Sequence, residues 1–331
     1  GEFSGRKRER ERGRLLTTTG PSRWLHYWAI LTVAAAAPLL FFGAEVTTRG
    51  VGMADPMGFR LPWELAGIGS TEGGLGLTIE HIHRLAGFVV GFCAILLVCG
   101  LWLRESRRWV RRLGLLALAG VIVQGLLGKF RVDLHAMFGP NLALIHGIFG
   151  QVVFALLASV AVLTSRPFAA EPESAVDEPE ARSVRRGALL LTGLVLAQLV
   201  FGAILRHQGS ALGQRAHLLT AFVVAATVTW LVVRVLGSKN WDRGVVLAVK
   251  LLAGLVVVQL VLGVETWMIK ASTPIGSMTQ ANLLGRDLVR SAHVLVGALI
   301  LGSSMAVTLV AHRRSVLRLN VTPVRTLEDA A

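Results

Sequence analysis

The chain has 331 residues, of which 53% are hydrophobic and only 16% are charged, whereas soluble domains carry roughly 25% charged residues. This composition excludes a soluble enzyme, a disordered chain and a nucleic-acid-binding module. The net charge of +14 does not restore nucleic acid as a partner, because Lys and Arg occur in short clusters between long apolar runs, as in proteins that cross a lipid bilayer several times.

Eight apolar runs are long enough to span a membrane, since about 20 apolar residues cross the hydrocarbon core. In chain order they cover residues 25–43, 83–103, 113–130, 141–163, 187–205, 216–236, 245–268 and 289–311. We interpret the first run as a retained span rather than a cleaved signal peptide, because it is long and weakly charged at its start. The opening Gly1-Glu2-Phe3-Ser4 resembles a tag remnant.

The connections between the spans differ in charge. Together with Arg234 and Lys250 at the adjoining ends of two spans, the N-terminal, second, fourth, sixth and C-terminal segments hold 24 of the 34 Lys and Arg residues. Basic connections stay on the cytoplasmic side, so we predict that both termini are cytoplasmic and that the protein lies in the cell membrane.

One connection differs in composition from the others. Residues 166–186 are rich in Glu, Pro and Ala without an apolar period, which predicts a flexible cytoplasmic linker. The predicted organisation is therefore a tag remnant with a basic N-terminus (1–23), an N-terminal half (24–165), the linker (166–186), a C-terminal half (187–312) and a cytoplasmic tail (313–331).

An internal repeat relates the spans of the two halves. The third, fifth and seventh spans end on Gln-x-x-x-Gly, at Gln124, Gln198 and Gln259, and the first ends on the same pattern with Leu39 in place of Gln. Each even span carries a histidine near its start, followed four residues later by Gly or Ala; these histidines are His83, His146, His217 and His293. We predict an all-α membrane protein of eight transmembrane helices, arranged as two four-helix bundles related by a pseudo-twofold axis.

The repeated histidines predict a buried haem in each half. A histidine inside a membrane span is a functional candidate by default, although a neutral histidine can also hydrogen-bond to a neighbouring helix. Two imidazoles facing each other across a bundle suit the two axial positions of haem iron, and the small residue one turn away leaves room for a porphyrin. Zinc is less suitable, because each half offers two nitrogens and no thiol or carboxylate cluster apart from Glu80.

Glu80 distinguishes the first half from the second. In Glu80-His81-Ile82-His83-Arg84 an acid lies one turn before the histidine, and no acid takes this position in the other even spans. Glu80 is either a reacting carboxylate or a helix-start carboxylate favoured by the helix dipole. His81 is expected to point away from the iron. Six cations at the outer rim are candidate contacts for haem propionates or, alternatively, boundary anchors: Arg49, Arg84, Arg131, Arg206, Arg215 and Lys270.

Taken together, Glu-x-x-His-Arg at Glu80, the preceding Thr-Arg-Gly-Val-Gly-Met-Ala-Asp-Pro loop at 48–56, the Gln-x-x-x-Gly repeats and one histidine in each even span resemble haem A synthase over residues 41–312. The resemblance implies an enzyme that uses dioxygen and an external electron donor to oxidise the C8 methyl group of haem O, in two hydroxylations, to the formyl group of haem A.

The resemblance also implies roles for individual residues. It assigns His83 and His146 to the substrate haem O, His217 and His293 to a haem b cofactor, and catalysis to Glu80. It further implies a place in cytochrome oxidase assembly, with a haem O synthase as the expected partner.

One feature departs from the family. Many bacterial members carry cysteine pairs in their outer loops, whereas Cys93 and Cys99 both lie inside one span, so a mechanism through a loop disulfide is excluded. The long first outer loop, 44–79, is predicted to cap the substrate pocket through its apolar side chains, which are Leu61, Trp63, Leu65, Leu75 and Leu77.

Two other classes of protein compete with this interpretation. A dihaem b-type electron-transfer cytochrome, whether non-catalytic or linked to quinol, would use the same ligands. A transporter is less favoured, because inverted repeats are expected there, whereas these repeats run parallel.

Overall fold

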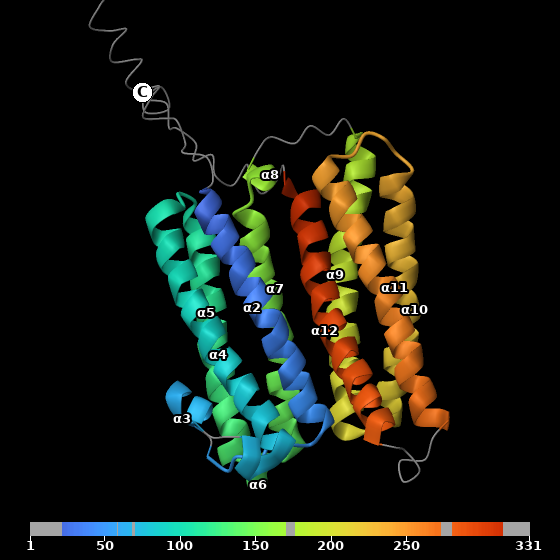
Figure 1. Ribbon diagram of the computed structural model, residues 1–331. Helices are drawn as coiled ribbons and strands as arrows, with labels where there is room; N and C mark the ends of the chain where they lie inside the picture. Colours follow the sequence, from blue (N-terminus) through green and yellow to red (C-terminus); the bar gives the residue numbers. More distant parts are fainter. Residues whose placement is uncertain (1–21, 58, 68–69, 170–175, 273–279, 314–331) are drawn as a thin grey trace, which may run out of the picture.

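The computed structural model describes residues 22–57, 59–67, 70–169, 176–272 and 280–313 (Figure 1). Within these residues there is no strand, and the eight predicted spans are confirmed as helices long and apolar enough to cross a membrane. The long helices are α2 (Arg23–Thr48), α4 (Ser70–Arg104), α5 (Arg108–Asp133), α7 (Pro140–Leu163), α9 (Glu178–Gln208), α10 (Ala211–Leu236), α11 (Arg243–Ser272) and α12 (Gln280–Ala311). Three short helices lie between them: α3 (Pro62–Gly67), α6 (His135–Phe138) and α8 (Arg166–Ala169).

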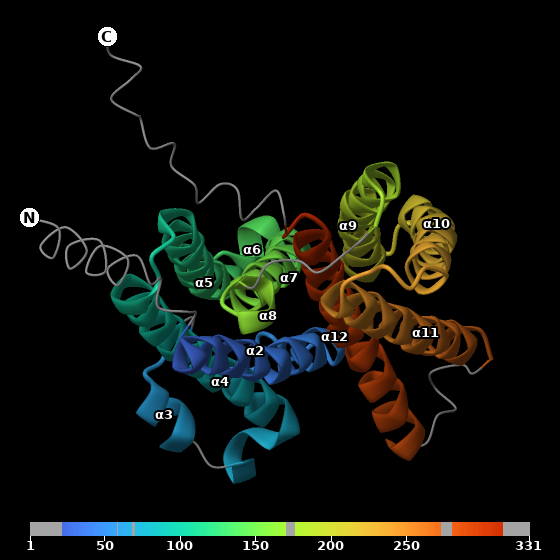
Figure 2. The ribbon, with the colours of Figure 1, turned by 90° about the horizontal axis from the view of Figure 1, so that it is seen from above.

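The long helices form two rings of four. In the first ring α2, α4, α5 and α7 each pack against two others, and α9 to α12 do the same in the second (Figure 2). Each ring has its own core of buried apolar side chains. The rings meet where α12 packs on α7 and α2, and where α7 packs on α9. These contacts are the ones that a twofold axis passing between α7 and α12 would produce, while the symmetry itself remains a prediction.

The four helices that carry the histidines, α4, α7, α10 and α12, begin earlier in the chain than the apolar runs that predict them. Helix α4 enters its membrane span at Gly74, where a φ of 68° kinks the helix. Helix α10 begins at Ala211. The apolar pattern marks only the hydrocarbon core, whereas helical hydrogen bonding continues into the polar interface. As a result the four histidines lie about two to four turns inside their helices.

The linker is shorter than predicted. Helix α9 begins at Glu178, inside the segment expected to be flexible, and α8 occupies its first residues. The sequence does carry a helix-start signal there, because Asp177 takes the N-cap position, Pro179 the first turn, and Glu178 and Glu180 the acidic positions that favour the dipole. The amino-acid composition of the segment, taken without the positions of these residues, does not reveal the helix start.

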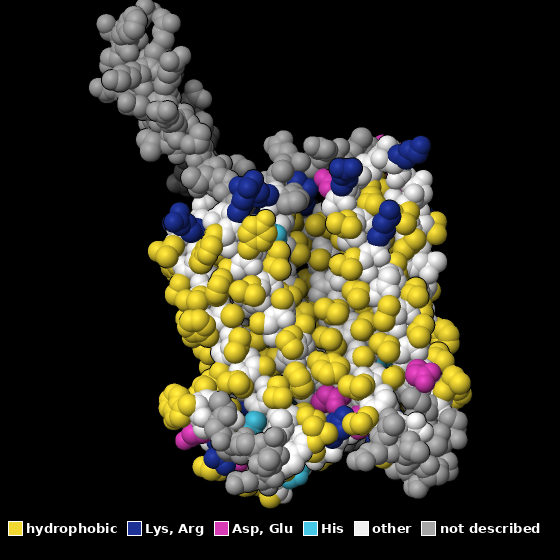
Figure 3. Space-filling view, in the orientation of Figure 1, with side chains coloured by type: hydrophobic (Ala, Val, Ile, Leu, Met, Phe, Trp, Pro, Cys, Tyr) yellow, Lys and Arg dark blue, Asp and Glu magenta, His cyan; other side chains and the backbone are white. Residues whose placement is uncertain are grey.

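The surface has the pattern of a multi-pass membrane protein. Figure 3 shows a broad apolar band around the middle of the molecule, with Lys and Arg gathered at the end where α2 begins and α12 ends. Helices α4, α7, α10 and α12, which carry the four histidines near their starts, begin at the opposite end, where α3 and α6 also lie. The charged end is the one predicted to be cytoplasmic.

Candidate functional site

The structure brings the four histidines together in two pairs, one in each ring. The ring centroids of His83 on α4 and His146 on α7 lie 6.4 Å apart, and those of His217 on α10 and His293 on α12 lie 6.2 Å apart. An imidazole nitrogen binds a metal ion at about 2 Å, so two histidines on opposite sides of one ion have centroids about 6 Å apart. Both pairs have this spacing.

The surroundings of the pairs favour haem iron over a simple metal site. No group of three or more His, Cys, Asp or Glu side chains suited to a metal ion occurs among the described residues. Zinc in proteins needs three or four such ligands. Two axial imidazoles suffice for haem iron, because the porphyrin fills the remaining positions.

Each histidine lies against the glycine that ends the repeat of the preceding long helix. A Cβ atom placed on Gly43 would lie 2.8 Å from Cε1 of His83, and one on Gly202 would lie 3.0 Å from Cε1 of His217. The same construction gives 3.4 Å between Gly128 and His146 and 3.3 Å between Gly263 and His293. The repeat thus supplies a flat stretch of helix against which each ring packs. The sequence showed these glycines but not this contact.

Two of the four rings donate a hydrogen bond from Nδ1 to a backbone carbonyl oxygen. Nδ1 of His83 donates to the carbonyl oxygen of Leu39 at 3.1 Å, and Nδ1 of His217 donates to that of Gln198 at 3.1 Å. A ring that donates from Nδ1 has a lone pair on Nε2, and backbone carbonyls commonly orient metal-binding histidines in this way. The Nδ1 atoms of His146 and His293 are buried and have no hydrogen-bond partner among the described residues.

The glutamines of the repeat also contact the histidine helices. The side-chain nitrogens of Gln198 and Gln259 lie 3.4 and 3.2 Å from Nε2 of His217 and His293, respectively. Gln124 instead donates to the carbonyl oxygen of His146 at 2.7 Å. The remaining histidine, His83, has Leu39 at the corresponding position and therefore no amide from the repeat.

Two of the small residues one turn after the histidines make room for these glutamines. A Cβ atom on Gly150 would lie 2.7 Å from Nε2 of Gln124, and one on Gly297 would lie 3.5 Å from Nε2 of Gln259. At Gly150 the side chain of Gln124 therefore lies in part of the room that the sequence predicts for a porphyrin.

Glu80 is buried beside the first pair, with 3% of its surface exposed. One carboxylate oxygen accepts a hydrogen bond from the backbone N–H of Asp55 at 2.9 Å, and the other accepts from the Arg84 guanidinium at 2.6 Å. The helix is kinked at Gly74, so its continuous part begins just after that residue and Glu80 lies beyond its first turn, where the dipole acts weakly. This position favours a chemical role for Glu80 over the interpretation as a helix-start carboxylate.

His81 points away from the pair. Its Nε2 lies 3.0 Å from a carboxylate oxygen of Asp55, a residue that is 1% exposed. Burial opposes ionisation of Asp55, but hydrogen bonds from Arg60, the Met57 N–H and His81, together with the charge of Arg84, lower its pKa to about 2. Asp55 is thus a buried carboxylate that remains ionised.

Three of the six predicted propionate contacts have partners within the protein. Arg84 pairs with Glu80 at 2.6 Å, Arg49 pairs with Glu45 at 2.7 Å, and Arg206 donates to Thr48 at 2.6 Å. To bind a propionate, these groups would have to exchange those partners.

The other three differ in how they are placed. Arg131 has no hydrogen bond or ion pair within the described part of the chain, and its charge acts on both His83 and His146. Arg215 is exposed and equally unpaired there. The side chain of Lys270 lies outside the described residues. Arg131 is therefore the best placed of the six for an anionic group beside the first pair.

A residue that sequence reasoning missed comes from the other half. His207 on α9 approaches α7, where its Nε2 would lie 3.8 Å from a Cβ atom on Gly147, next to His146. Its only signal in the sequence was its position directly after Arg206 at the outer end of the fifth span. The contact of α7 with α9 places it there.

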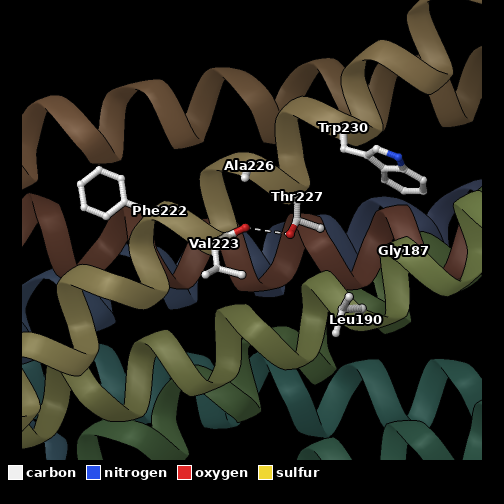
Figure 4. A pocket seen from close by; sticks show the side chains of 7 residues that line it. All are labelled: Gly187, Leu190, Phe222, Val223, Ala226, Thr227 and Trp230. Carbon is white, nitrogen blue, oxygen red and sulfur yellow. Dashed lines mark hydrogen bonds between the residues drawn. The ribbon is translucent and has the colours of Figure 1, made fainter.

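An apolar groove between α9 and α10 lies apart from the histidines. Its lining includes Gly187, Leu190, Phe222 and Trp230, with Phe222 and Trp230 at opposite ends (Figure 4). The hydroxyl group of Thr227 donates to the carbonyl oxygen of Val223 at 2.7 Å. The lining has no titratable group, so the groove offers no chemistry of its own.

A known protein family matches the part of the chain that carries the first histidine pair and Glu80. Residues 75–214 match the COX15-CtaA family, described as cytochrome oxidase assembly protein. The match contains Glu80, His83 and His146 and ends shortly before His217. No curated protein matches the chain.

Proposed function

We propose that the chain is a haem A synthase, because residues 75–214 match the COX15-CtaA family of cytochrome oxidase assembly proteins, a family that acts in haem A synthesis. In this proposal it oxidises the C8 methyl group of haem O to the formyl group of haem A within the membrane. Its substrates are haem O and dioxygen, and an external donor supplies electrons.

One observation carries the proposal. The matched segment holds a buried carboxylate, Glu80, one helical turn from a histidine pair with the spacing of two ligands of one iron. The second pair has the same spacing and no such acid. A half that only holds a cofactor needs ligands, whereas a half that reacts also needs a group that moves protons or stabilises charge.

The residues then divide into two sets. His83 and His146 bind and orient the substrate haem, with Arg131 near its anionic edge, and His217 and His293 hold haem b. When bound, haem b supplies a one-electron relay towards the first half. Glu80 accepts a proton or stabilises positive charge as the methyl carbon is oxidised. Two hydroxylations of that carbon give a geminal diol, which loses water to leave the formyl group.

The cellular setting follows from the topology. We infer that the protein lies in the cell membrane with both termini in the cytoplasm and both pairs nearer the outer face. A haem O synthase in the same membrane would supply the substrate.

The experiment is production of the protein in a host that makes haem O but has no haem A synthase of its own. We expect haem A in extracts of these membranes by chromatography, and none in membranes without the protein. His135→Ala, which changes an exposed histidine on α6, is the matched control and should leave haem A unchanged. Haem b in the purified protein with no conversion of haem O would instead identify a b-type electron carrier.

A further inference from the structure

Hydrogen bonds join the first outer loop to α4 in the first ring, and Asp55 makes two of them. We propose that Asp55 is a positioning residue, which holds the described part of the first outer loop, residues 51–57 and 59–60, against the helices so that Glu80 keeps the orientation needed for the reaction. This inference rests on the proposed function. It adds polar contacts to the predicted apolar cap, of which Leu65 is buried, whereas Trp63 and Leu75 are 69% and 60% exposed.

The loop itself provides one of the two groups that orient Glu80. The backbone N–H of Asp55 donates to Glu80 at 2.9 Å, so the direction of the carboxylate depends on where the loop backbone lies. The second group, Arg84, is also held by the loop, since it donates to the carbonyl oxygen of Met57 at 2.6 Å and to that of Asp55 at 3.3 Å. The loop therefore supplies one of the two contacts of Glu80 and holds the guanidinium that makes the other.

The side chain of Asp55 fixes the loop in this position. Arg60 donates to its two oxygens at 2.5 and 3.2 Å, and the Met57 N–H donates at 3.0 Å, which shapes the turn. The same carboxylate reaches His81 on α4 at 3.0 Å, directly after Glu80. Asp55 thus joins the loop to the helix that carries the acid. Charge-assisted hydrogen bonds of this kind are shorter and stronger than neutral ones.

Two close backbone contacts place the loop over the first histidine pair. A Cβ atom on Gly52 would lie 2.1 Å from the Arg131 guanidinium, and one on Gly76 would lie 2.9 Å from Val51. Arg131 belongs to α5 and its charge acts on His83 and His146. The loop therefore covers the end of the ring between α4 and α5.

A double-mutant cycle tests whether Asp55 acts through Glu80. Asp55→Asn keeps the size of the side chain and removes its charge. We expect it to lower kcat for haem O by about ten- to a hundredfold, the scale of a misplaced reacting group, with KM within about threefold of wild type. In the Glu80→Gln background the same change should cost nothing further. Asp133→Asn is the matched control, because it removes an exposed carboxylate paired with Lys129 on α5, and it should be silent in both backgrounds.

An equal loss of kcat in both backgrounds would show that Asp55 acts independently of Glu80 and would overturn the proposal, as would a wild-type rate in Asp55→Asn. If Asp55→Asn does not fold, as judged by haem b content, Arg60→Gln replaces it in the same cycle. Arg60 lies in the loop and contacts Asp55 but not Glu80. An equal loss of kcat in both backgrounds, or a wild-type rate in Arg60→Gln, would then overturn the proposal.

Hydrogen exchange of the purified protein tests the loop without turnover. In wild type the Asp55 amide is bonded to Glu80, so peptides covering residues 51–60 should exchange slowly. Asp55→Asn should raise their exchange rate about tenfold or more, and Asp133→Asn should not. Unchanged exchange in Asp55→Asn would overturn the inference. Failure of wild type to make haem A would count against the proposed function and would leave this result standing.

Discussion

At four places in the molecule a glycine lies directly against the ring of a histidine on the next long helix. At Gly43 and Gly202 a Cβ atom would lie 2.8 and 3.0 Å from the imidazole, so the absence of a side chain there determines where the ring can lie. Gly193 on α9 offers a contrast, because a Cβ atom there would meet nothing within 4 Å. Two glycines of one helix therefore have different tolerance for alanine.

We predict that Gly202→Ala reduces the haem b content of the purified protein severalfold or more, because the new methyl group displaces His217. Gly193→Ala should retain full haem b and gain up to about 1 kcal/mol of helix stability, since alanine is the better helix former. A pyridine haemochrome spectrum measures both. Equal haem b in the two variants would mean that the ring has room to move.

The charge of Glu80 is expected to matter for the reaction and not for folding. Glu80→Gln keeps the shape and can still accept hydrogen bonds, so folding and haem b content should stay near normal. Conversion of haem O should fall by about a hundredfold or more, with haem O or a singly hydroxylated product accumulating. Chromatography of extracted haems decides this. Haem A formed at the wild-type rate would leave Glu80 without a chemical role and favour the electron carrier.

Asp55 should keep the loop closed over the whole physiological pH range. A carboxyl group whose pKa is lowered in the folded protein stabilises it above the unfolded pKa, and the stabilisation is lost as the pH falls through the folded pKa. With a folded pKa of about 2 and an ordinary value of 3.8, exchange of residues 51–60, corrected for intrinsic rates, should be flat from pH 7 to about 4 and rise only below. A rise between pH 7 and 5 would point to another group.

At the scale of helices, the sequence predicted most of what the structure shows. The eight spans and the histidine pairs were predictable, because a polar residue at a repeated position stands out in an apolar run. The start of α9 at Glu178 is not predicted by composition, because Glu and Pro residues are common in flexible linkers and also in the first turn of helices. The role of Asp55 could not be predicted, since it depends on how an aperiodic loop folds back over α4.

The two pairs of helices that carry the histidines should respond separately to mutation. His217→Ala or His293→Ala removes one of two axial ligands from the second ring and should reduce resident haem b. His83→Ala and His146→Ala should leave haem b in place and impair binding of haem O. Haem b content and haem O titration of purified variants distinguish the two effects. Full haem b in His217→Ala together with its loss in His83→Ala would reverse the assignment of the halves.

At the scale of the whole molecule, the two rings are joined by polar contacts at the histidine end. Arg206 of α9 donates to the Ala44 carbonyl oxygen at 2.7 Å, next to the glycine that supports His83, and Thr48 lies 3.4 Å from Ser291 of α12. In an apolar environment such bonds fix the relative position of helices. The spacing between the two pairs is therefore set by protein contacts as well as by the connections.

The orientation of the molecule in the membrane is testable with single cysteines on the two ends. In a Cys99→Ser background, Met137→Cys on α6 should react with an impermeant thiol reagent in intact cells, because α6 lies at the predicted outer end. Lys239→Cys, between α10 and α11, should react only after permeabilisation. Both residues are exposed, so a difference in labelling reports the side of the membrane on which each residue lies. The opposite labelling pattern would place the termini outside.

The exception in the repeat bears on how long each haem stays. Under the proposed function, the second ring must keep its haem through many turnovers, whereas the first must release product each time. Gln198 and Gln259 lie beside the rings that hold the resident haem, and Leu39 leaves His83 without an amide. The departure of Leu39 from the repeat thus lies in the half from which, under the proposed function, the product must leave, and residence time, more than affinity, is the property in which the two halves would differ.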